Sequence, residues 1–321
     1  MRIVLISQDP KDQEFLGRVS QSLSVSMQQF SSAAPGVDDL ARDPAAMVFI
    51  DVATPSLYSA FENCVADKLG LYSALVNPNH YFFIAPTPFQ KATYLHSSQI
   101  CGNFIQRRYH DLDHHFFAKV LANTTSENAF GVERYLSDGA KCQSIQLKKS
   151  IEKNLVIDAL QEYLARWGMN SRAAGLIVNA ADELMLNAIY DAPVDDLGKP
   201  LYSTLPRNTS LDLPEKGYVN VKIAHDDDTI AISATDQYGS FDRQRLLSVL
   251  ARDYQVEEFK VKSNVAGSGL GLVESFSNSA GAILVCEPGV KTEFMFFHKR
   301  VASFKDFRDQ FRFLATHVIQ N

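Results

Sequence analysis

The chain has 321 residues, of which 46% are hydrophobic and 21% charged, and it carries a formal net charge of −6. This composition excludes an intrinsically disordered chain, and the length favours two domains that each bury a core. The negative charge and the lack of a long Lys/Arg run give no electrostatic basis for binding nucleic acid or a membrane surface. We therefore expect a protein partner or a small ligand.

Cysteine usage and the N-terminal segment indicate the compartment. Cys64, Cys101, Cys142 and Cys286 show no Cys-x-x-Cys spacing, so neither a zinc site nor a disulfide framework is predicted. The first apolar run, residues 3–7 at most, is too short for a signal peptide or a membrane span. We expect a cytoplasmic protein.

Three short apolar runs, at residues 3–6, 47–50 and 81–84, lie in the first part of the chain with helix-like segments between them. Uninterrupted apolar strands of this kind are typical of a parallel sheet covered on both faces. The pattern predicts a doubly wound α/β domain over residues 1–122.

The segment Phe49-Ile50-Asp51-Val52-Ala53-Thr54-Pro55 includes the second of these runs. Together with the spacing of the runs, it resembles the receiver domain of response regulators, in which the aspartate at this position is phosphorylated. The resemblance implies a receiver-like fold for residues 1–122 and Asp51 as the phosphoacceptor.

The rest of the receiver pocket departs from that family. Ser7 and Gln8 stand where receivers carry two acidic magnesium ligands, with only Asp9 beyond them. Ala85 and Arg107 align with the family's threonine or serine and with its lysine. Because phosphorylation of an aspartate needs a divalent ion to offset charge on the phosphoryl oxygens, the sequence favours a strand-end relic over a phosphoacceptor. We interpret the domain as a pseudo-receiver that serves docking or dimerisation.

A polar segment over residues 123–143 is predicted to link this domain to the rest of the chain. The helix-like segment before it, residues 111–121, carries His114 and His115, but no second long helix is predicted that would form the phosphoacceptor hairpin of sensor histidine kinases. That class of enzyme is a third interpretation, which would require a phosphohistidine.

The second half of the chain is predicted to alternate helices and strands. Apolar spacing and an Asn170 or Ser171 cap predict two helices, and alternation predicts the strands around them. The expected elements are a strand at 144–148, helices at 151–167 and 171–190, and strands at 218–223 and 229–234.

Three motifs follow in order: Ala181-Asp182-Glu183-Leu184-Met185-Leu186-Asn187-Ala188, Thr235-Asp236-Gln237-Tyr238-Gly239 and Gly267-Ser268-Gly269-Leu270-Gly271-Leu272. Glu183 and Asn187 are four residues apart on a predicted helix, so both side chains lie on one face. The alternating glycines allow backbone N–H groups to approach phosphate oxygens, and the helix after them has an N-terminus that favours anions.

Together the motifs resemble the N, G1 and G2 boxes of the Bergerat-type (histidine kinase-like) ATPase domain, which histidine kinases, anti-sigma-factor serine kinases and type II topoisomerases share. The resemblance covers residues 144–300 and implies an α/β two-layer fold that binds ATP and Mg²⁺. A strand and a helix before the N-box helix, without a phosphoacceptor hairpin, are closest to anti-sigma-factor serine kinases.

The resemblance also implies roles for single residues. Glu183 corresponds to the base that orients or deprotonates the attacking hydroxyl or water, Asn187 to the ligand of Mg²⁺, and Asp236 to the acceptor of the adenine amino group. The other positions that it implies for nucleotide binding are Gly239, Gly267, Gly269, Leu270 and Gly271.

Two departures from the family concern the same site. The G1 box usually reads Asp-x-Gly-x-Gly, whereas Tyr238 and Ser240 occupy its glycine positions, and a tyrosine there either fills part of the adenine pocket or stacks on the base. The basic residue that kinases often carry just after the N-box asparagine is missing, because Tyr190 and Asp191 stand there.

Three further segments have open roles. The long proline-rich loop 191–217 either covers the nucleotide site or a partner surface, or is a neutral excursion. Residues 242–266 correspond to the family's ATP lid, with a helical piece near 246–250. Apolar residues at helical spacing over 301–321 predict a C-terminal amphipathic helix that packs on its own domain or on a partner.

The sequence thus favours a cytoplasmic signalling protein that binds ATP and Mg²⁺ and regulates or phosphorylates a protein partner such as a transcription regulator. The alternative is a catalytically silent scaffold of pseudo-receiver and pseudo-ATPase domains, and a homodimer fits either. Whether the chain catalyses phosphoryl transfer is left open by the sequence.

Overall fold

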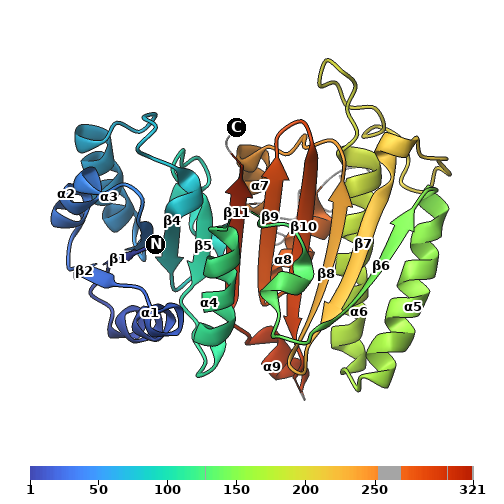
Figure 1. Ribbon diagram of the computed structural model, residues 1–321, viewed down its shortest axis with the longest axis horizontal. Helices are drawn as coiled ribbons and strands as arrows, with labels where there is room; N and C mark the ends of the chain where they lie inside the picture. The colour runs from blue at the N-terminus through green and yellow to red at the C-terminus, as the bar shows by residue number, and fades with distance from the viewer. Residues whose placement is uncertain (127, 252–268, 302, 320–321) are drawn as a thin grey trace. The chain divides into compact units, whose positions relative to one another are not determined.

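The computed structural model describes residues 1–126, 128–251, 269–301 and 303–319. The chain forms two compact units: unit 1 comprises Met1–Asn128 and Phe311–Thr316, and unit 2 comprises Ala129–Gln310 and His317–Asn321. Both units combine helices with a sheet (Figure 1), so the α/β class predicted from the sequence is confirmed.

Unit 1 is built on parallel strands in the order β2-β1-β3-β4-β5. Their bounds are Ile3–Ile6 for β1, Met27–Phe30 for β2, Met47–Asp51 for β3, Tyr81–Ala85 for β4 and Asn103–Gln106 for β5. The three apolar runs predicted as strands are β1, β3 and β4, and all three are buried along almost their whole length. In a parallel sheet of this order, a crevice lies outside the carboxyl ends of β1 and β3, where the strand order reverses.

The helices of unit 1 form two pairs, α1 with α4 and α2 with α3 (Figure 1). They span Pro10–Leu23 (α1), Ala33–Arg42 (α2), Pro55–Lys68 (α3) and Asp113–Thr124 (α4), with short 3-10 turns between β3 and β5. Asp9 caps α1 by accepting a hydrogen bond from the Lys11 N–H, and Pro10 occupies the first turn. This combination is a strong start signal for a helix.

The C-terminal segment corrects the prediction of an amphipathic helix over 301–321. Among the described residues of this segment, only Phe304–Arg308 is helical (α9), and Arg312–Val318 forms a strand, β11, which pairs antiparallel with β5 of unit 1. The Phe311 ring lies in an aromatic cluster with Phe15 and Phe117. The open edge of β5 and this cluster stabilise a strand, so tertiary pairing overrides the helical spacing of the apolar residues.

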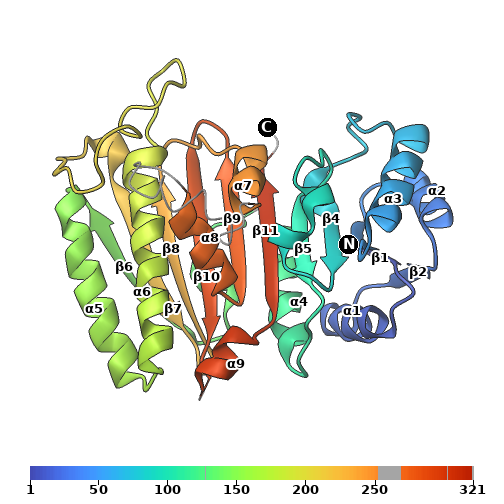
Figure 2. The ribbon, with the colours of Figure 1, turned by 180° about the vertical axis from the view of Figure 1, so that it is seen from behind.

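Unit 2 is an antiparallel sheet in the order β9-β10-β8-β7-β6. The strands span Lys141–Leu147 (β6), Val219–His225 (β7), Thr229–Asp236 (β8), Gly281–Glu287 (β9) and Lys291–Lys299 (β10). The helices lie on one face of the sheet (Figure 2) and span Lys153–Arg166 (α5), Ser171–Leu186 (α6), Arg243–Leu250 (α7) and Leu270–Ser277 (α8).

The expected linker over 123–143 is wrong in most of its length. Helix α4 continues to Thr124, and a 3-10 turn at Val132–Tyr135 lies on the sheet face opposite the helices, against β7 and β8 (Figure 1). Val132 and Tyr135 are fully buried. Their burial depends on a sheet face formed by residues 80 to 100 positions later, which local polarity does not reveal.

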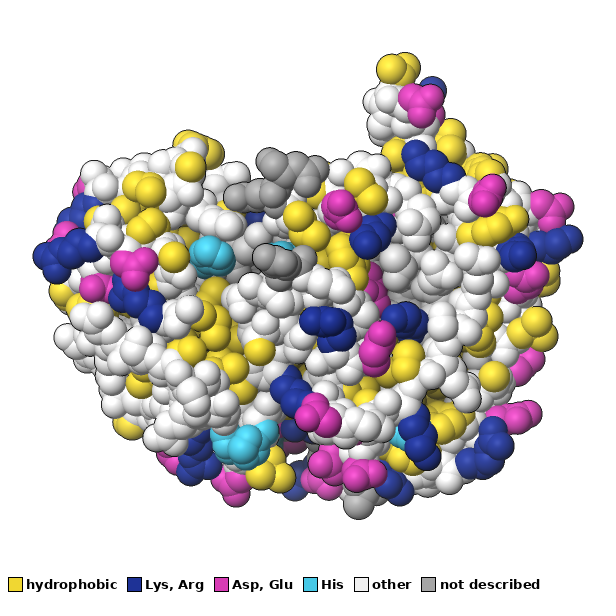
Figure 3. Space-filling model, viewed as in Figure 1, with side chains coloured by type: hydrophobic (Ala, Val, Ile, Leu, Met, Phe, Trp, Pro, Cys, Tyr) yellow, Lys and Arg dark blue, Asp and Glu magenta, His cyan; other side chains and the backbone are white. Residues whose placement is uncertain are grey.

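Within the described residues, no helix combines the length and the apolar character needed to cross a bilayer. On the face drawn in Figure 3, Lys and Arg side chains lie interspersed with Asp and Glu side chains. That mixture of signs fits the modest net charge of the chain.

Candidate functional site

The first motif lies at the C-terminal end of α6. Asn170 caps this helix by accepting hydrogen bonds from two backbone N–H groups, and an apolar stripe that includes Ile177 and Ala181 is buried. Glu183 and Asn187 lie one turn apart, and the Asn187 Nδ2 atom donates to the Glu183 Oε1 atom over 3.3 Å. The asparagine's Oδ1 atom therefore remains as the acceptor, the atom type that Mg²⁺ prefers as a ligand.

The helix does not end at Asn187 but widens into a π-helical turn over Asn187–Asp191, which the Ala192 N–H closes by donating to the Asn187 carbonyl over 2.9 Å. Such turns occur often at functional sites. Here the wider turn carries the chain from the last residue of the first motif into the proline-rich loop.

The second motif places Asp236 at the end of β8, where it is buried. Its Oδ1 atom accepts hydrogen bonds from the backbone N–H groups of Tyr238 at 2.8 Å and Gly239 at 3.3 Å. Burial nevertheless raises the pKa of Asp236 to about 6, and the two backbone donors only partly offset this effect. Burial makes the charged form of this carboxyl group costly unless hydrogen-bond donors face it. A ligand that offers such a donor is therefore favoured over one that does not.

The third motif begins α8. Gly269 has a φ of 70°, in the left-handed region that favours glycine, and it precedes the first helical residue, Leu270. A Cβ atom on Gly271 would lie 2.2 Å from the Glu183 Oε2 atom, so the backbone of the third motif directly contacts the carboxylate of the first. Gly267 and Ser268 lie outside the described residues.

Side chains from all three motifs line one hollow in unit 2. Glu183, Asn187, Asp236 and Gly269 border it, and its cavity volume is about 170 Å³. Its lining combines apolar side chains with a few polar groups, as small-molecule sites do. The apolar lining consists of Leu184, Ala188, Ala192, Ala234, Phe241, Leu246, Val249, Leu272, Leu284 and Phe294.

Glu183 is the titratable group of the hollow that suits proton transfer. Burial raises the pKa of the Glu183 carboxyl group, whereas the charge of Arg207 and the Asn187 hydrogen bond lower it. A carboxylate whose pKa is raised toward neutrality is a better general base at physiological pH than an exposed one.

Tyr238 is the first departure in the second motif. Its side chain does not line the hollow; the ring is buried, with the Lys216 Nζ atom 5.2 Å from its centre. Gly239 explains the local turn: it has a φ of 56°, and a Cβ atom there would lie 2.2 Å from the Glu287 carbonyl oxygen. The displaced glycine of this motif is thus required by packing on the β9–β10 turn.

Ser240, the other departure in the second motif, does line the hollow. Its hydroxyl group donates to the Ala192 carbonyl over 2.7 Å and so ties the end of β8 to the start of the proline-rich loop. The sequence indicated only that a glycine was missing here, because the acceptor lies 48 residues away.

Two arginines line the hollow that the sequence did not single out, Arg207 from the proline-rich loop and Arg245 from α7. The Arg207 Nη2 atom lies 2.7 Å from the Asp191 Oδ2 atom, and its Nη1 atom donates to the Leu186 carbonyl over 3.2 Å. An isolated arginine in a long loop carries no sequence signal, so only the fold reveals it.

The donor set fits a magnesium nucleotide. The hollow offers a buried carboxylate, apolar walls for a planar base, two guanidinium groups and an amide oxygen. Among the described residues, no group of three or more His, Cys, Asp or Glu side chains could hold a metal ion.

Asp51 in unit 1 lies in a different environment. The Arg107 guanidinium contacts three carboxylates, those of Asp9 at 3.2 Å, Asp12 at 2.7 Å and Asp51 at 2.7 Å. The Tyr109 hydroxyl also donates to Asp12 over 2.8 Å. The sequence pointed to Arg107 but missed Asp12, whose side chain is fully buried. An arginine thus stands among carboxylates where a receiver would hold a divalent cation.

No protein-family model matches this chain, and a search of the curated proteins finds no match.

Proposed function

We propose that unit 2 binds ATP with Mg²⁺ in the hollow described above, and that the chain uses this nucleotide in the cytoplasm to regulate or phosphorylate a protein partner. The observation that carries the proposal is that Glu183, Asn187, Asp236 and Gly269, which are spread over 87 positions of the sequence, border one hollow. The choice of ATP with Mg²⁺ as the ligand rests on the resemblance of the three motifs to Bergerat-type ATPases, and most closely to anti-sigma-factor serine kinases.

Each residue has a role that its chemistry supports. Asp236 accepts a hydrogen bond from the adenine amino group, and the base lies between apolar walls. The backbone at Gly269 and the start of α8 faces the anionic phosphate groups. Asn187 presents its Oδ1 atom to Mg²⁺, and Glu183 orients or deprotonates the attacking hydroxyl group. When bound, Mg²⁺ offsets negative charge on the phosphate oxygens.

Titration of a fluorescent ATP analogue with and without Mg²⁺ tests the binding. We expect saturable binding that unlabelled ATP competes away and that Mg²⁺ strengthens. Asn187→Ala should remove the Mg²⁺ effect, whereas the matched control Asn154→Ala, at an exposed position of α5, should leave it unchanged. Absence of saturable binding at millimolar nucleotide would contradict the proposal.

Turnover of ATP by the saturated protein tests catalysis separately. Glu183→Gln should reduce release or transfer of the γ-phosphate and keep nucleotide affinity, whereas Glu274→Gln, at an exposed position of α8, should change neither. If the wild-type protein binds ATP but does not turn it over, the nucleotide acts as a regulatory ligand and the phosphorylation half of the proposal fails.

For unit 1 we propose a receiver-like scaffold that takes no phosphoryl group. The contacts of Arg107 with Asp9, Asp12 and Asp51 favour this role, because the guanidinium neutralises the carboxylates that a divalent ion would have to reach. Incubation with acetyl phosphate and Mg²⁺ should give no acid-stable, hydroxylamine-labile label on Asp51. Stoichiometric labelling would overturn the assignment.

A further inference from the structure

The charged side chains of the hollow in unit 2 bear on how it would bind a polyanion. Among the described residues that line it, the carboxylates outnumber the guanidinium groups. The carboxylates are Glu183, Asp191, Asp236 and Asp242, and the guanidinium groups are Arg207 and Arg245. A guanidinium group that turned from a protein carboxylate to the phosphate oxygens would add positive charge to that of Mg²⁺.

Arg207 is placed to do this. Its guanidinium group is held by the Asp191 carboxylate at 2.7 Å and lies 5.3 Å from the centre of the Tyr190 ring. Both partners belong to the π-helical turn that begins at Asn187. The side chain of Arg207 is 22% exposed and that of Asp191 21%, so the pair lies at the wall of the hollow and not in the core. The charge of Arg207 also acts on Glu183.

The backbone around Arg207 is fixed from two sides, although it belongs to a long loop. The Thr209 carbonyl accepts hydrogen bonds from the Tyr190 hydroxyl over 2.6 Å and from the Ser150 hydroxyl over 3.1 Å. The Ser150 N–H donates to the Leu211 carbonyl over 2.9 Å. A side chain whose backbone is already fixed loses less conformational entropy when it binds a ligand.

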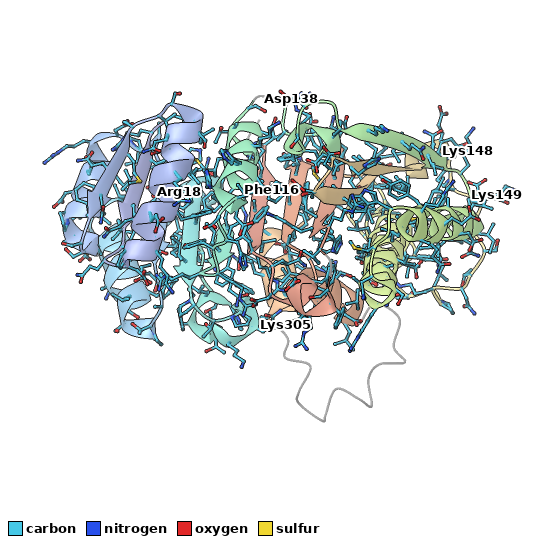
Figure 4. All side chains as sticks on the ribbon, turned by 90° about the horizontal axis from the view of Figure 1, so that it is seen from below. Arg18, Phe116, Asp138, Lys148, Lys149 and Lys305 are labelled. Atoms are coloured by element: carbon cyan, nitrogen blue, oxygen red, sulfur yellow. The ribbon has the colours of Figure 1, made fainter. Side chains whose placement is uncertain are left out.

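The loop is attached further along at the end of β6, where Figure 4 labels Lys148 and Lys149. The Leu213 N–H donates to the Lys148 carbonyl over 2.9 Å, and Lys149 forms an ion pair with Asp212 at 3.1 Å. These contacts fix the segment after Arg207 to the end of β6, and Arg207 itself lines the hollow.

We propose that Arg207 is the phosphate-binding cation of the hollow and exchanges the Asp191 carboxylate for oxygens of the terminal phosphate groups when a nucleoside triphosphate binds. This inference rests on the proposed function. The planar guanidinium fork can bind two phosphate oxygens at once, which a lysine cannot do. The loop residue thereby takes the place of the basic residue that is missing after Asn187.

Affinities of three probes test the exchange: adenosine, ADP with Mg²⁺, and a non-hydrolysable ATP analogue with Mg²⁺. For Arg207→Ala, we expect a loss of about 10- to 100-fold for the ATP analogue, a smaller loss for ADP and no change for adenosine. Lys216→Ala is the matched control, because this cation comes from the same loop but does not line the hollow, and it should leave all three affinities unchanged.

Two more variants separate the exchange from a structural role. Arg207→Lys keeps the charge without the fork and should lose part of the affinity for the ATP analogue. Asp191→Asn releases Arg207 and should tighten binding of the analogue several-fold; weaker or equal binding would overturn the exchange. If the wild-type protein binds none of the probes, the proposed function fails as well. If it binds the analogue and Arg207→Ala binds it equally well, only this inference fails.

Discussion

Asp236→Asn is expected to change stability and nucleotide binding in opposite directions. Burial raises the pKa of Asp236 to about 6, well above the value of about 3.9 that an aspartate has in an unfolded chain. The folded state therefore binds this proton more tightly than the unfolded state does. The stability that this group contributes is fully present below about pH 4 and is lost as the pH rises through about 6.

The size of the effect follows from the difference between the two pKa values. It corresponds to about 3 kcal/mol of folding free energy at a pH well above 6. Asparagine carries no charge and keeps one oxygen for the N–H groups of Tyr238 and Gly239. We therefore expect Asp236→Asn to raise the free energy of unfolding by about 1–3 kcal/mol near pH 7.5 and to leave it almost unchanged near pH 4. The same change should abolish binding of ATP, because the amide presents a donor to the adenine amino group.

Urea denaturation followed by tryptophan fluorescence measures this difference in unit 2 alone, since the one tryptophan of the chain, Trp167, follows α5. The variant is compared with wild type at several pH values, and Asp242→Asn, at an exposed position on the rim of the hollow, is the control. A stability difference that does not depend on pH, or a less stable variant near pH 7.5, would refute the reasoning about Asp236.

Three other variants test the structure away from the nucleotide chemistry. Arg107→Met leaves the buried Asp12 carboxylate without its ion pair and should cost about 3–5 kcal/mol, measured by far-UV circular dichroism in urea. Burial lowers the pKa of His298 to about 4, so the stability of the wild-type protein relative to that of His298→Leu should fall by up to about 3 kcal/mol as the pH falls from about 6.5 to about 4. Gly239→Ala would bring a Cβ atom to 2.2 Å from the Glu287 carbonyl at a φ of 56°, and thermal unfolding should show a loss of at least about 2 kcal/mol.

Local patterns predicted most of the elements because the signals for them lie within a few residues. The run Ile3–Ile6 is β1, and the Asn170 cap begins α6 as expected. The spacing of Glu183 and Asn187 also predicted their contact, because a helical turn fixes the distance between such residues. These features depend on backbone geometry that the chain cannot alter without losing the helix or the strand.

The wrong predictions involve partners that are distant in the sequence. Arg312–Val318 became a strand because its partner, β5, lies some 200 residues earlier, and an apolar stripe alone does not distinguish a helix from a strand beside an open edge. Tyr135 was assigned to a linker because its burial depends on β7 and β8. In the same way, no local pattern connects Arg207 with Asp191 or Asp12 with Arg107.

The two arginines that hold carboxylates illustrate why a ligand is expected in unit 2 and not at Asp51. Arg107 contacts three carboxylates and its side chain is only 9% exposed, so an incoming anion would have to displace several ion pairs and leave buried charges unpaired. Arg207 contacts one carboxylate that is partly exposed, beside a hollow with apolar walls. Breaking one partly exposed ion pair costs about 1 kcal/mol or less, which contacts between the guanidinium and a phosphate group exceed. The ion pairs of Arg107 therefore oppose anion binding at Asp51, whereas Arg207 can exchange its single carboxylate partner for a phosphate group.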